Sequence, residues 1–357
     1  MSTEHWIALN EFGKFGPVSM ARLFSHFDTM EAAWNADASE LIKAGIKPKL
    51  ATSFAHLRSN TNPEALHAIL IRNEVTTVTI ADEEYPPLLK TIHDPPAVLY
   101  IKGKLPSAHL PHVGIVGSRK ATTYGIEAAK ALTRELVESK AVIVSGLAYG
   151  IDETAHIETL NNSGKTIAVL GYGILYKGTG RSRYIADKII ERGGAVISEF
   201  PMNAPGLKQN FPYRNRVIAG ISQGTLIIEA TKKSGSLITA RAALDQNRDV
   251  FAVPGPITSK NSEGTNNLLK MGATPVTEAA DILNILKVEQ IKTETKKIVP
   301  DSQEEATILD FLSKAPIHID EITQESHLDP ASVSSTLSLM EMKGRARHIG
   351  GMYYVRT

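Results

Sequence analysis

The sequence predicts an α/β fold in three parts, the central one an extended, Rossmann-like, doubly wound parallel sheet. Between residues 111 and 286, short apolar runs alternate with amphipathic segments, which is the pattern of parallel strands joined by helices. Residues 4–60 contain only short helical patterns. Residues 304–357 predict three helices and a hairpin, which is the element order of a winged helix-turn-helix.

The first part, residues 1–65, is expected to be a small helical interaction domain of the sterile-alpha-motif kind. Two segments, residues 12–17 and 41–48, are similar to the hairpin of helix-hairpin-helix modules, whose backbone N–H groups contact phosphate. Lys14 and Lys47 occupy positions where such hairpins carry glycine. Direct DNA contact by this domain therefore stays the alternative. The expected helices cover residues 4–11, 17–27, 29–35, 38–44 and 48–59.

The middle part, residues 66–286, is expected to form one sheet with helices on both faces. The strand at residues 225–229 is apolar nearly throughout, as a strand buried on both faces must be. Two β-rich runs, residues 75–80 and 98–101, extend the sheet across a proline-rich stretch. The other strands are expected at residues 112–116, 141–145, 166–170, 195–198, 250–253 and 275–277. Helices are expected at residues 124–139, 151–161, 183–192, 213–221, 237–246 and 265–270.

The last part follows a charged, aperiodic linker at residues 287–303 and is the winged-helix domain. Its recognition helix, expected at residues 330–342, carries one acidic residue and no basic one. A helix that reads the major groove normally projects Arg, Lys, Asn or Gln. We therefore expect this domain to contact protein and to add little to DNA affinity. The remaining helices are expected at residues 304–313 and 319–324, and the hairpin turns at Gly350-Gly351.

Composition and charge narrow the function classes. The 357 residues are 42% hydrophobic and 22% charged, which is typical of a soluble chain that forms a core. The absence of cysteine excludes disulfides and thiol catalysis. The start of the chain has no secretory pattern, and no window approaches the ~18 apolar residues of a membrane helix. We therefore expect a cytoplasmic protein with no membrane contact.

The charge is divided along the chain. Residues 110–286 carry 20 basic and 15 acidic groups, whereas residues 304–357 carry 5 basic and 8 acidic groups. Because local charge sets the field that a polyanion meets, the middle part is the expected place for a nucleic acid.

Glycine and polar residues follow several predicted strands, at the edge where open α/β sheets bind ligands. After the strand at residues 112–116, Gly117 permits close backbone approach, Ser118 offers a hydroxyl and Arg119 offers a bidentate phosphate clamp. The dinucleotide pattern G-x-G-x-x-G is absent from this loop. After the next strand, Gly146 begins a turn toward Asp152, which is at least as well explained as a helix N-cap as by a catalytic role.

Two further clusters are candidate contacts for a nucleic acid. Residues 208–216 interleave cations with an aromatic ring, which supplies phosphate neutralisation and a surface for base stacking. Residues 232–239 place small residues at the start of a helix, which makes an anion site, with a plain strand-to-helix turn as the alternative. The candidates are Lys208, Phe211, Arg214 and Arg216 in the first cluster, and Lys233, Ser234, Gly235 and Ser236 in the second.

Catalytic and metal-binding patterns are absent from the sequence. Gly164-Lys165-Thr166 is similar to the end of a P-loop, but it precedes a strand instead of following one. The 11 histidines form no pattern of metal ligands. Asp152 and His156 lie on one helix face, where capping and packing explain both. The residues therefore predict no catalytic group, no metal and no cofactor.

These motifs together resemble the DNA-processing protein A family, DprA, also called Smf. They follow the family order between residues 117 and 255, and the flanking helical and winged-helix domains also match. The motifs are Gly117-Ser118-Arg119, Ser145-Gly146-Leu147-Ala148, Gly150-Ile151-Asp152, Ser198-Glu199-Phe200-Pro201, Asn210-Phe211-Pro212, Arg214-Asn215-Arg216, Ser234-Gly235-Ser236 and Val253-Pro254-Gly255.

The resemblance implies a bacterial, cytoplasmic, non-catalytic protein that binds single-stranded DNA. In the family such a protein dimerises, protects incoming strands during natural transformation and helps to load RecA recombinase. The loop at residues 174–184 departs from the family pattern, because it lacks the usual Tyr-Pro and gains Lys177, Arg181 and Arg183. The resemblance places the phosphate and base pocket on Ser118, Arg119, Gly146, Lys208, Phe211, Arg214 and Ser236.

Two other functions stay open as alternatives to a single-strand-binding mediator. Nucleotide phosphoribohydrolases of the cytokinin-activating kind have a related Rossmann-like fold, but their Pro-Gly-Gly-x-Gly-Thr-x-x-Glu signature is absent here. A transcription regulator would read DNA with its winged helix, which the composition of the expected recognition helix disfavours.

Overall fold

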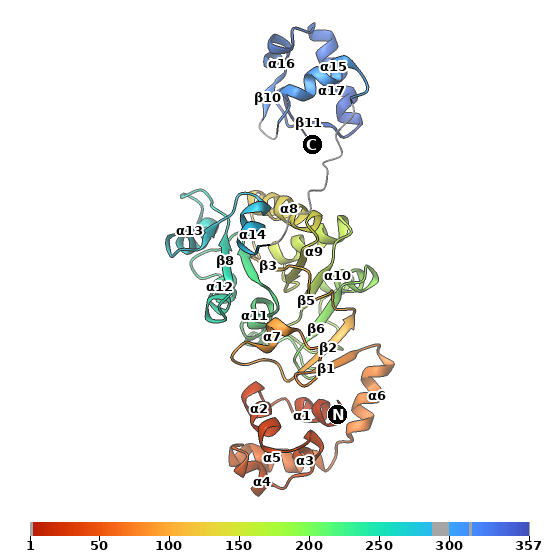
Figure 1. Ribbon diagram of the computed structural model, residues 1–357, viewed down its shortest axis with the longest axis vertical. Coiled ribbons are helices and arrows are strands. Elements are labelled where there is room, and N and C mark those ends of the chain that lie inside the picture. The colour runs from red at the N-terminus through yellow and green to blue at the C-terminus, as the bar shows by residue number, and fades with distance from the viewer. Residues whose placement is uncertain (1–2, 288–299, 314–315, 357) are drawn as a thin grey trace. The chain divides into compact units, whose positions relative to one another are not determined.

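Among the described residues, a nine-stranded sheet lies at the centre of the N-terminal part of the chain, and the predicted fold class is confirmed. The structure is a computed structural model that describes residues 3–287, 300–313 and 316–356. It consists of two compact units, Met1–Ile291 and Lys292–Thr357 (Figure 1). Of the predicted linker at residues 287–303, residues 288–299 lie outside the described part. Within the described residues, no helix is long and apolar enough to cross a membrane.

The strand order of the large sheet creates a switch point between β3 and β7. The order is β1-β2-β6-β5-β4-β3-β7-β8-β9. Strands β3 to β9 are parallel, and β1 and β2 add an antiparallel edge. Because β3 has β4 on one side and β7 on the other, the connections diverge there and leave a crevice at the carboxyl ends. The strands are β1 (Thr76–Thr79), β2 (Val98–Gly103), β3 (His112–Val116), β4 (Val142–Ser145), β5 (Thr166–Val169), β6 (Ala195–Ser198), β7 (Gly224–Ile227), β8 (Asp249–Ala252) and β9 (Thr274–Pro275).

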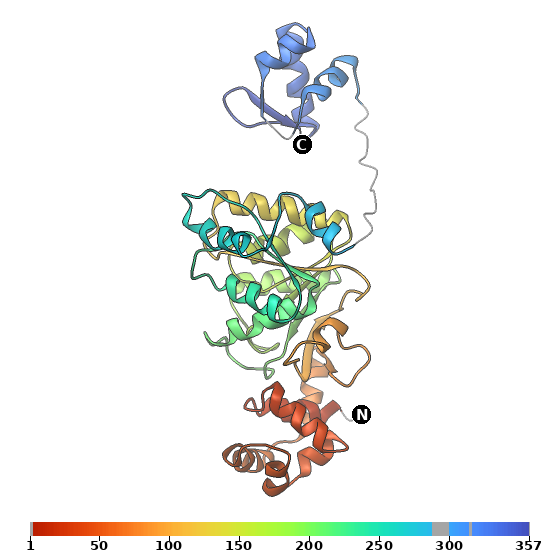
Figure 2. The ribbon, with the colours of Figure 1, turned by 60° about the vertical axis from the view of Figure 1, so that its left-hand side comes forward.

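Helices cover both faces of this sheet (Figure 2). Apolar residues of α8, α9 and α14 form the core on one face, and those of α7, α11 and α12 form the core on the other. These helices and their neighbours are α7 (Pro87–Lys90), α8 (Thr123–Glu138), α9 (Ile151–Asn161), α10 (Gly180–Glu191), α11 (Asn210–Ile221), α12 (Ser236–Asp245), the 3-10 helix η1 (Lys260–Ser262), α13 (Glu263–Lys270) and α14 (Ala279–Ile285).

Two of these helices begin three residues earlier than predicted. Helix α10 begins at Gly180 instead of residue 183, because the Thr179 side chain accepts a hydrogen bond from the Ser182 N–H and caps it. Helix α11 begins at Asn210 instead of residue 213, so Phe211 lies in its first turn. Helices α7 and α14 were not predicted: α7 is a single turn that starts at a proline, and α14 has only seven residues.

The N-terminal helices pack on the antiparallel edge of the sheet and share a core with it. The Tyr100 hydroxyl of β2 donates a hydrogen bond to Glu11 Oε1 (2.9 Å). Asn10 Nδ2 donates to the Glu199 carbonyl (3.1 Å), which follows β6. These contacts fix the end of α1 against the sheet. The helices are α1 (Thr3–Glu11), α2 (Pro17–His26), α3 (Met30–Asn35), α4 (Ala38–Lys43), α5 (Pro48–Arg58) and α6 (Pro63–Arg72). Helix α6 was not predicted, and the expected domain boundary at residue 65 falls inside it.

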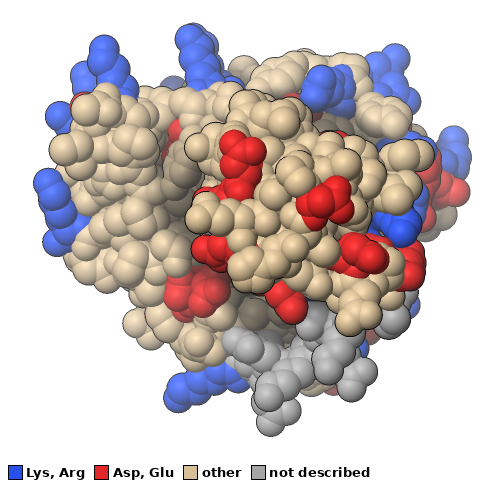
Figure 3. Space-filling model, turned by 90° about the horizontal axis from the view of Figure 1, so that it is seen from above, with Lys and Arg blue, Asp and Glu red and all other residues tan. Residues whose placement is uncertain are grey.

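The part of the C-terminal unit that the structure describes contains three helices and an antiparallel sheet of order β10-β12-β11, as expected for a winged helix. Figure 3 looks onto this unit and shows acidic side chains on its surface. Exposed acidic residues of α16 include Asp320, Glu321 and Glu325. The elements are α15 (Gln303–Phe311), β10 (Ile317–His318), α16 (Ile319–Ser326), α17 (Pro330–Met342), β11 (Ala346–His348) and β12 (Tyr353–Arg356).

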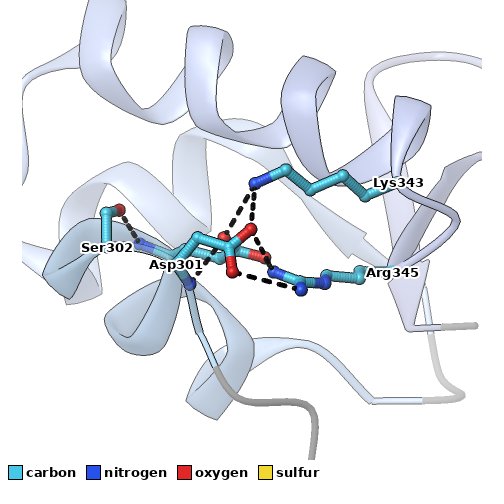
Figure 4. Close-up of polar contacts among 5 residues, drawn as sticks. Asp301, Ser302, Lys343 and Arg345 are labelled. Carbon is cyan, nitrogen blue, oxygen red and sulfur yellow. Dashed lines mark hydrogen bonds and ion pairs between the residues drawn. The ribbon is translucent and has the colours of Figure 1, made fainter.

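A cluster of ion pairs connects the start of α15 to the end of α17 (Figure 4). Glu305, whose side chain is 4% exposed, pairs with Arg345. Lys343 Nζ lies 2.7 Å from Asp301 Oδ2 and 3.4 Å from Glu305 Oε2. Burial alone would raise the pKa of Glu305, but the hydrogen bonds from Arg345, Lys343 and the Asp301 N–H outweigh burial and lower that pKa. The cluster therefore neutralises both cations within the domain.

Replacing Arg345 by alanine should loosen the C-terminal unit, because the buried Glu305 carboxylate loses its main partner. Local opening of the unit should increase several-fold, because hydrogen bonds to a charged group are lost. Hydrogen-exchange mass spectrometry of the full chain should show this increase for peptides from α15 and α17. Arg347→Ala is the matched control, because Arg347 is an exposed cation on the neighbouring strand. Equal protection in the two variants would contradict a stabilising role for the cluster.

Candidate nucleic-acid interface

A cavity of about 630 Å³ lies at the carboxyl edge of the sheet, at the switch point. We call it the strand-end cavity. Residues that follow β3, β4, β6 and β7 enclose it, because parallel strands bring their carboxyl ends to the same edge. The predicted site residues that line it are Gly117, Ser118, Arg119, Lys208, Phe211, Arg214, Ser234, Gly235 and Ser236.

Arg119 and Phe211 form a cation–aromatic pair in the wall of this cavity. The Arg119 guanidinium carbon lies 5.5 Å from the centroid of the Phe211 ring. Arg119 and Lys208 are exposed, whereas Phe211 is half-buried. Arg119 and Lys208 can therefore meet a phosphate while the Phe211 ring offers a face to a base. Ser118 is buried behind them, and its Oγ accepts a hydrogen bond from the Lys120 N–H (3.1 Å).

Arg214 is buried beneath the cavity and joins helix α11 to the ends of two strands. Its Nη1 donates hydrogen bonds to the Gly146 carbonyl (2.9 Å) and to the Val169 carbonyl, which end β4 and β5. Burial lowers the pKa of Arg214 to about 10, although Asp152 opposes that shift, so the guanidinium stays charged at neutral pH. A Cβ atom at Gly146 would overlap this guanidinium, so the close approach of the two residues requires glycine.

Asp152 is the buried counter-charge of Arg214. Its Oδ2 accepts a hydrogen bond from the Gly146 N–H (3.2 Å). Burial raises the pKa of Asp152, and Arg214 and three backbone N–H groups oppose the rise. Asp152 therefore stabilises the loops after β3 and β4, which agrees better with a structural role than with an exposed catalytic acid.

The first turns of α11 and α12 both face the strand-end cavity. Phe211 and Pro212 come from the first turn of α11, and Ser236 begins α12. The hydroxyls of Ser234 and Ser236 lie 2.7 Å apart, and Ser234 Oγ accepts a hydrogen bond from the Ser236 N–H (3.3 Å). At α12 the N–H groups of Ser236, Leu237 and Ile238 already donate hydrogen bonds to Ser234 and Gly235, so the helix dipole is what favours an anion there. Two such helix ends in one cavity provide a setting for phosphate.

Three predicted site residues lie outside the lining of the strand-end cavity. Gly146 lies behind it, next to Arg214. Lys233 is exposed on the loop before α12 and is not part of the lining. Arg216 is buried on another side of α11, where it pairs with Glu199 and its Nε lies 3.3 Å from Asp94 Oδ2. Its charge is thus used inside the fold.

Two asparagines that line the cavity were not among the predicted site residues. Asn215 Nδ2 donates a hydrogen bond to the Gly235 carbonyl (3.3 Å) and so joins α11 to the loop before α12. Its position between two predicted arginines was the available signal. Asn261 Nδ2 donates to the Lys120 carbonyl (2.8 Å) from η1, which is distant in the sequence, and no local pattern indicates it.

The cavity offers cationic side chains and an aromatic ring, and the acidic and histidine side chains near it have other contacts or are neutral. The nearby Glu229 carboxylate is occupied, because it accepts hydrogen bonds from the N–H (2.9 Å) and hydroxyl (2.6 Å) of Thr122 and fixes the start of α8. Burial lowers the pKa of His156 to about 3, so it is neutral at physiological pH. In the residues that the structure describes, no group of three or more His, Asp or Glu side chains could hold a metal ion.

Comparison with known proteins gives consistent matches over most of the chain. The family model of DNA recombination-mediator protein A matches residues 76–287, and that of the DprA winged helix domain matches residues 292–352. The chain is 37% identical to protein Smf of Escherichia coli over 287 residues, which cover 80% of this chain and 76% of that protein. It is 38% identical to DNA processing protein DprA of Bacillus subtilis over 219 residues, which cover 61% of this chain and 73% of that protein.

Two solved structures of DNA processing protein A are also similar. The crystal structure from Streptococcus pneumoniae matches with a TM-score of 0.66 and 31% identity, over 78% of this chain and 95% of that one. The Helicobacter pylori protein, whose structure concerns its mode of single-stranded DNA binding, matches with a TM-score of 0.53 and 29% identity, over 60% of this chain and 96% of that one. The resemblance seen in the motifs is confirmed, and the chain belongs to the DNA recombination-mediator protein A (DprA) family.

Proposed function

We propose that this protein binds single-stranded DNA in the strand-end cavity and acts as a recombination mediator. The observation that carries this proposal is the placement of exposed Arg119 beside the Phe211 ring, within one cavity that also holds two helix N-termini. This arrangement supplies charge for phosphates and a stacking surface for bases. The single-stranded DNA binding described for the Helicobacter pylori relative supports the same assignment.

We propose direct contact with DNA for fewer residues than the sequence analysis predicts. Arg119, Lys208 and Phe211 are accessible in the cavity, and Ser234 and Ser236 lie at the start of α12. We propose that Arg214 and Gly146 act by positioning, because their contacts are with each other and with the strand ends. We propose no direct contact for Arg216, which forms ion pairs inside the fold, or for Lys233, which is exposed outside the cavity lining.

The proposed cellular role follows the family. We propose that the protein works in the cytoplasm as a homodimer, protects incoming single strands during natural transformation and loads RecA recombinase. Membership of a recombination-mediator family supports this role. Light scattering at micromolar concentrations tests the dimer, and a RecA strand-exchange assay with coated single strands tests loading. A monomer at all concentrations, or no stimulation of RecA, would contradict the respective part.

Alanine at Arg119, Lys208 or Phe211 should weaken binding of all single-stranded sequences alike. Loss of base stacking in Phe211→Ala should cost about 1–3 kcal/mol. The logarithm of affinity should fall with the logarithm of salt concentration by about 0.7 per phosphate contact, and Arg119→Ala should reduce this slope. Fluorescence anisotropy with labelled oligo-dT and an equal-length duplex, at two salt concentrations, measures both effects. Equal wild-type affinity for the duplex at moderate salt would contradict the proposal.

Truncation after residue 287 should leave single-strand affinity within about threefold, or roughly 0.65 kcal/mol. Two cations that follow helix α17, Lys343 and Arg345, are paired with Asp301 and Glu305. Acidic residues are exposed on the same unit, and like charge opposes a polyanion. The same titration on the truncated protein, with its folding checked by circular dichroism, makes the measurement. A tenfold loss would place part of the DNA site in the C-terminal unit.

No catalytic turnover is expected. Asp152 and Glu229 are buried and hydrogen-bonded to loop and helix N–H groups, so neither is free to move a proton at a bound ligand. Nucleotides and single-stranded DNA, each with and without Mg²⁺, should remain intact on incubation with the purified protein. Hydrolysis that disappears in Asp152→Asn or Glu229→Gln, with the variant still folded, would restore the enzyme alternative.

A further inference from the structure

A second cavity, of about 290 Å³, adjoins the strand-end cavity. The two share Arg119, Ala148 and Phe211 in their walls. The second cavity extends from this shared wall to the loop after β5 and the start of α10, which is the part of the chain that departs from the family pattern. We call it the tyrosine cavity, after Tyr149, Tyr172 and Tyr176 in its lining.

The aromatic rings of the tyrosine cavity continue from Phe211. A Cβ atom at Gly206 would lie 3.4 Å from Phe211 Cζ and 3.6 Å from Tyr172 Cδ1, so both rings border the same small space. The centroids of the Tyr172 and Tyr176 rings are 5.6 Å apart, with an interplanar angle of 63°. The rings of Phe211, Tyr172 and Tyr176 thus form a continuous series along the two cavities.

Two of the tyrosines are exposed to solvent, whereas aromatic side chains of a hydrophobic core are buried. Tyr149 is 55% exposed and Tyr176 is 44% exposed. They come from different loops, after β4 and after β5, and both line the tyrosine cavity. Exposed rings that line a cavity beside a cationic site are the arrangement by which proteins stack the bases of a single strand.

At the tyrosine cavity, the buried carboxylate of Glu153 holds the guanidinium of Arg181 in place. Arg181, at the start of α10, pairs with Glu153 of α9. The Glu153 side chain is only 10% exposed, whereas that of Arg181 is 65% exposed. The pair fixes the guanidinium in the lining and offsets its charge, so beyond the wall shared with Arg119 stacking is the main interaction that the cavity offers.

We propose that the tyrosine cavity is a second subsite, which stacks one or more bases of the strand whose phosphates occupy the strand-end cavity. This inference rests on the proposed function. The shared wall of Arg119 and Phe211 makes the two cavities adjacent, so one continuous strand passes from the first to the second. Tyr149 and Tyr176 are the stacking residues, and Arg181 is a positioning residue at the rim.

The test compares a strand with bases and a strand without them. Full-length wild-type protein and the double variant Tyr149→Ala/Tyr176→Ala are titrated by anisotropy with labelled dT20 and with an abasic strand of equal length. The double variant should bind dT20 about tenfold or more weakly, and the abasic strand within twofold of wild type. Tyr149→Phe/Tyr176→Phe should restore dT20 affinity, because the phenyl ring also stacks.

Tyr184→Ala is the matched control, because Tyr184 is 63% exposed on α10 and lines neither cavity. It should bind both strands as the wild type does. A dT20 affinity of the double variant equal to that of wild type would overturn the second subsite and leave the proposed function intact. An equal loss on the abasic strand, with melting unchanged by circular dichroism, would overturn base stacking. Wild-type protein that binds neither strand would overturn the proposed function itself.

Discussion

The geometry of the candidate site depends on the buried guanidinium of Arg214. Hydrogen bonds from its Nη1 to the carbonyls of Gly146 and Val169 join α11 to the ends of β4 and β5. Asp152 supplies the opposite charge, without which a buried cation would be costly. Residues three apart on a helix lie on one face, so fixing Arg214 also fixes Phe211 one turn earlier. The aromatic wall that both cavities share follows from this contact.

The secondary structure was largely predictable from the sequence because its signals are local. Buried strands appear as apolar runs, and the helices between them show a regular apolar face. Two of the differences from the prediction have local causes. Thr179 starts α10 early by capping it, and the one turn of α7 occupies a stretch whose prolines suggest an extended chain. The loop glycines of the candidate site were recognisable because they follow strands that meet at one edge of the sheet.

Whether each cation is exposed or paired inside the fold was much less predictable, because pairing depends on partners distant in the sequence. Arg214 and Arg216 lie two residues apart in one basic motif, yet the first supports the strand ends and the second pairs with Glu199 and Asp94. Arg119 keeps its charge exposed beside Phe211. The number of cations in the middle part therefore overstates the positive charge available at its surface, because Arg214 and Arg216 face carboxylates inside the fold.

Glu199, the partner of Arg216, connects the N-terminal helices to the candidate site. Glu199 accepts a hydrogen bond from Arg216 of α11 through its side chain, and its carbonyl accepts one from Asn10 at the end of α1. Burial raises the pKa of Glu199 to about 7, Arg216 opposes that shift and Asp94 adds to it, so loss of Arg216 would leave a poorly compensated buried carboxyl group. Helix α11 thus contacts the cavities through Phe211 and Arg214. Through Arg216 it contacts Glu199, which also bonds to the end of α1. The helical segment and the sheet share a core as well as these bonds, which explains why the two belong to one compact unit.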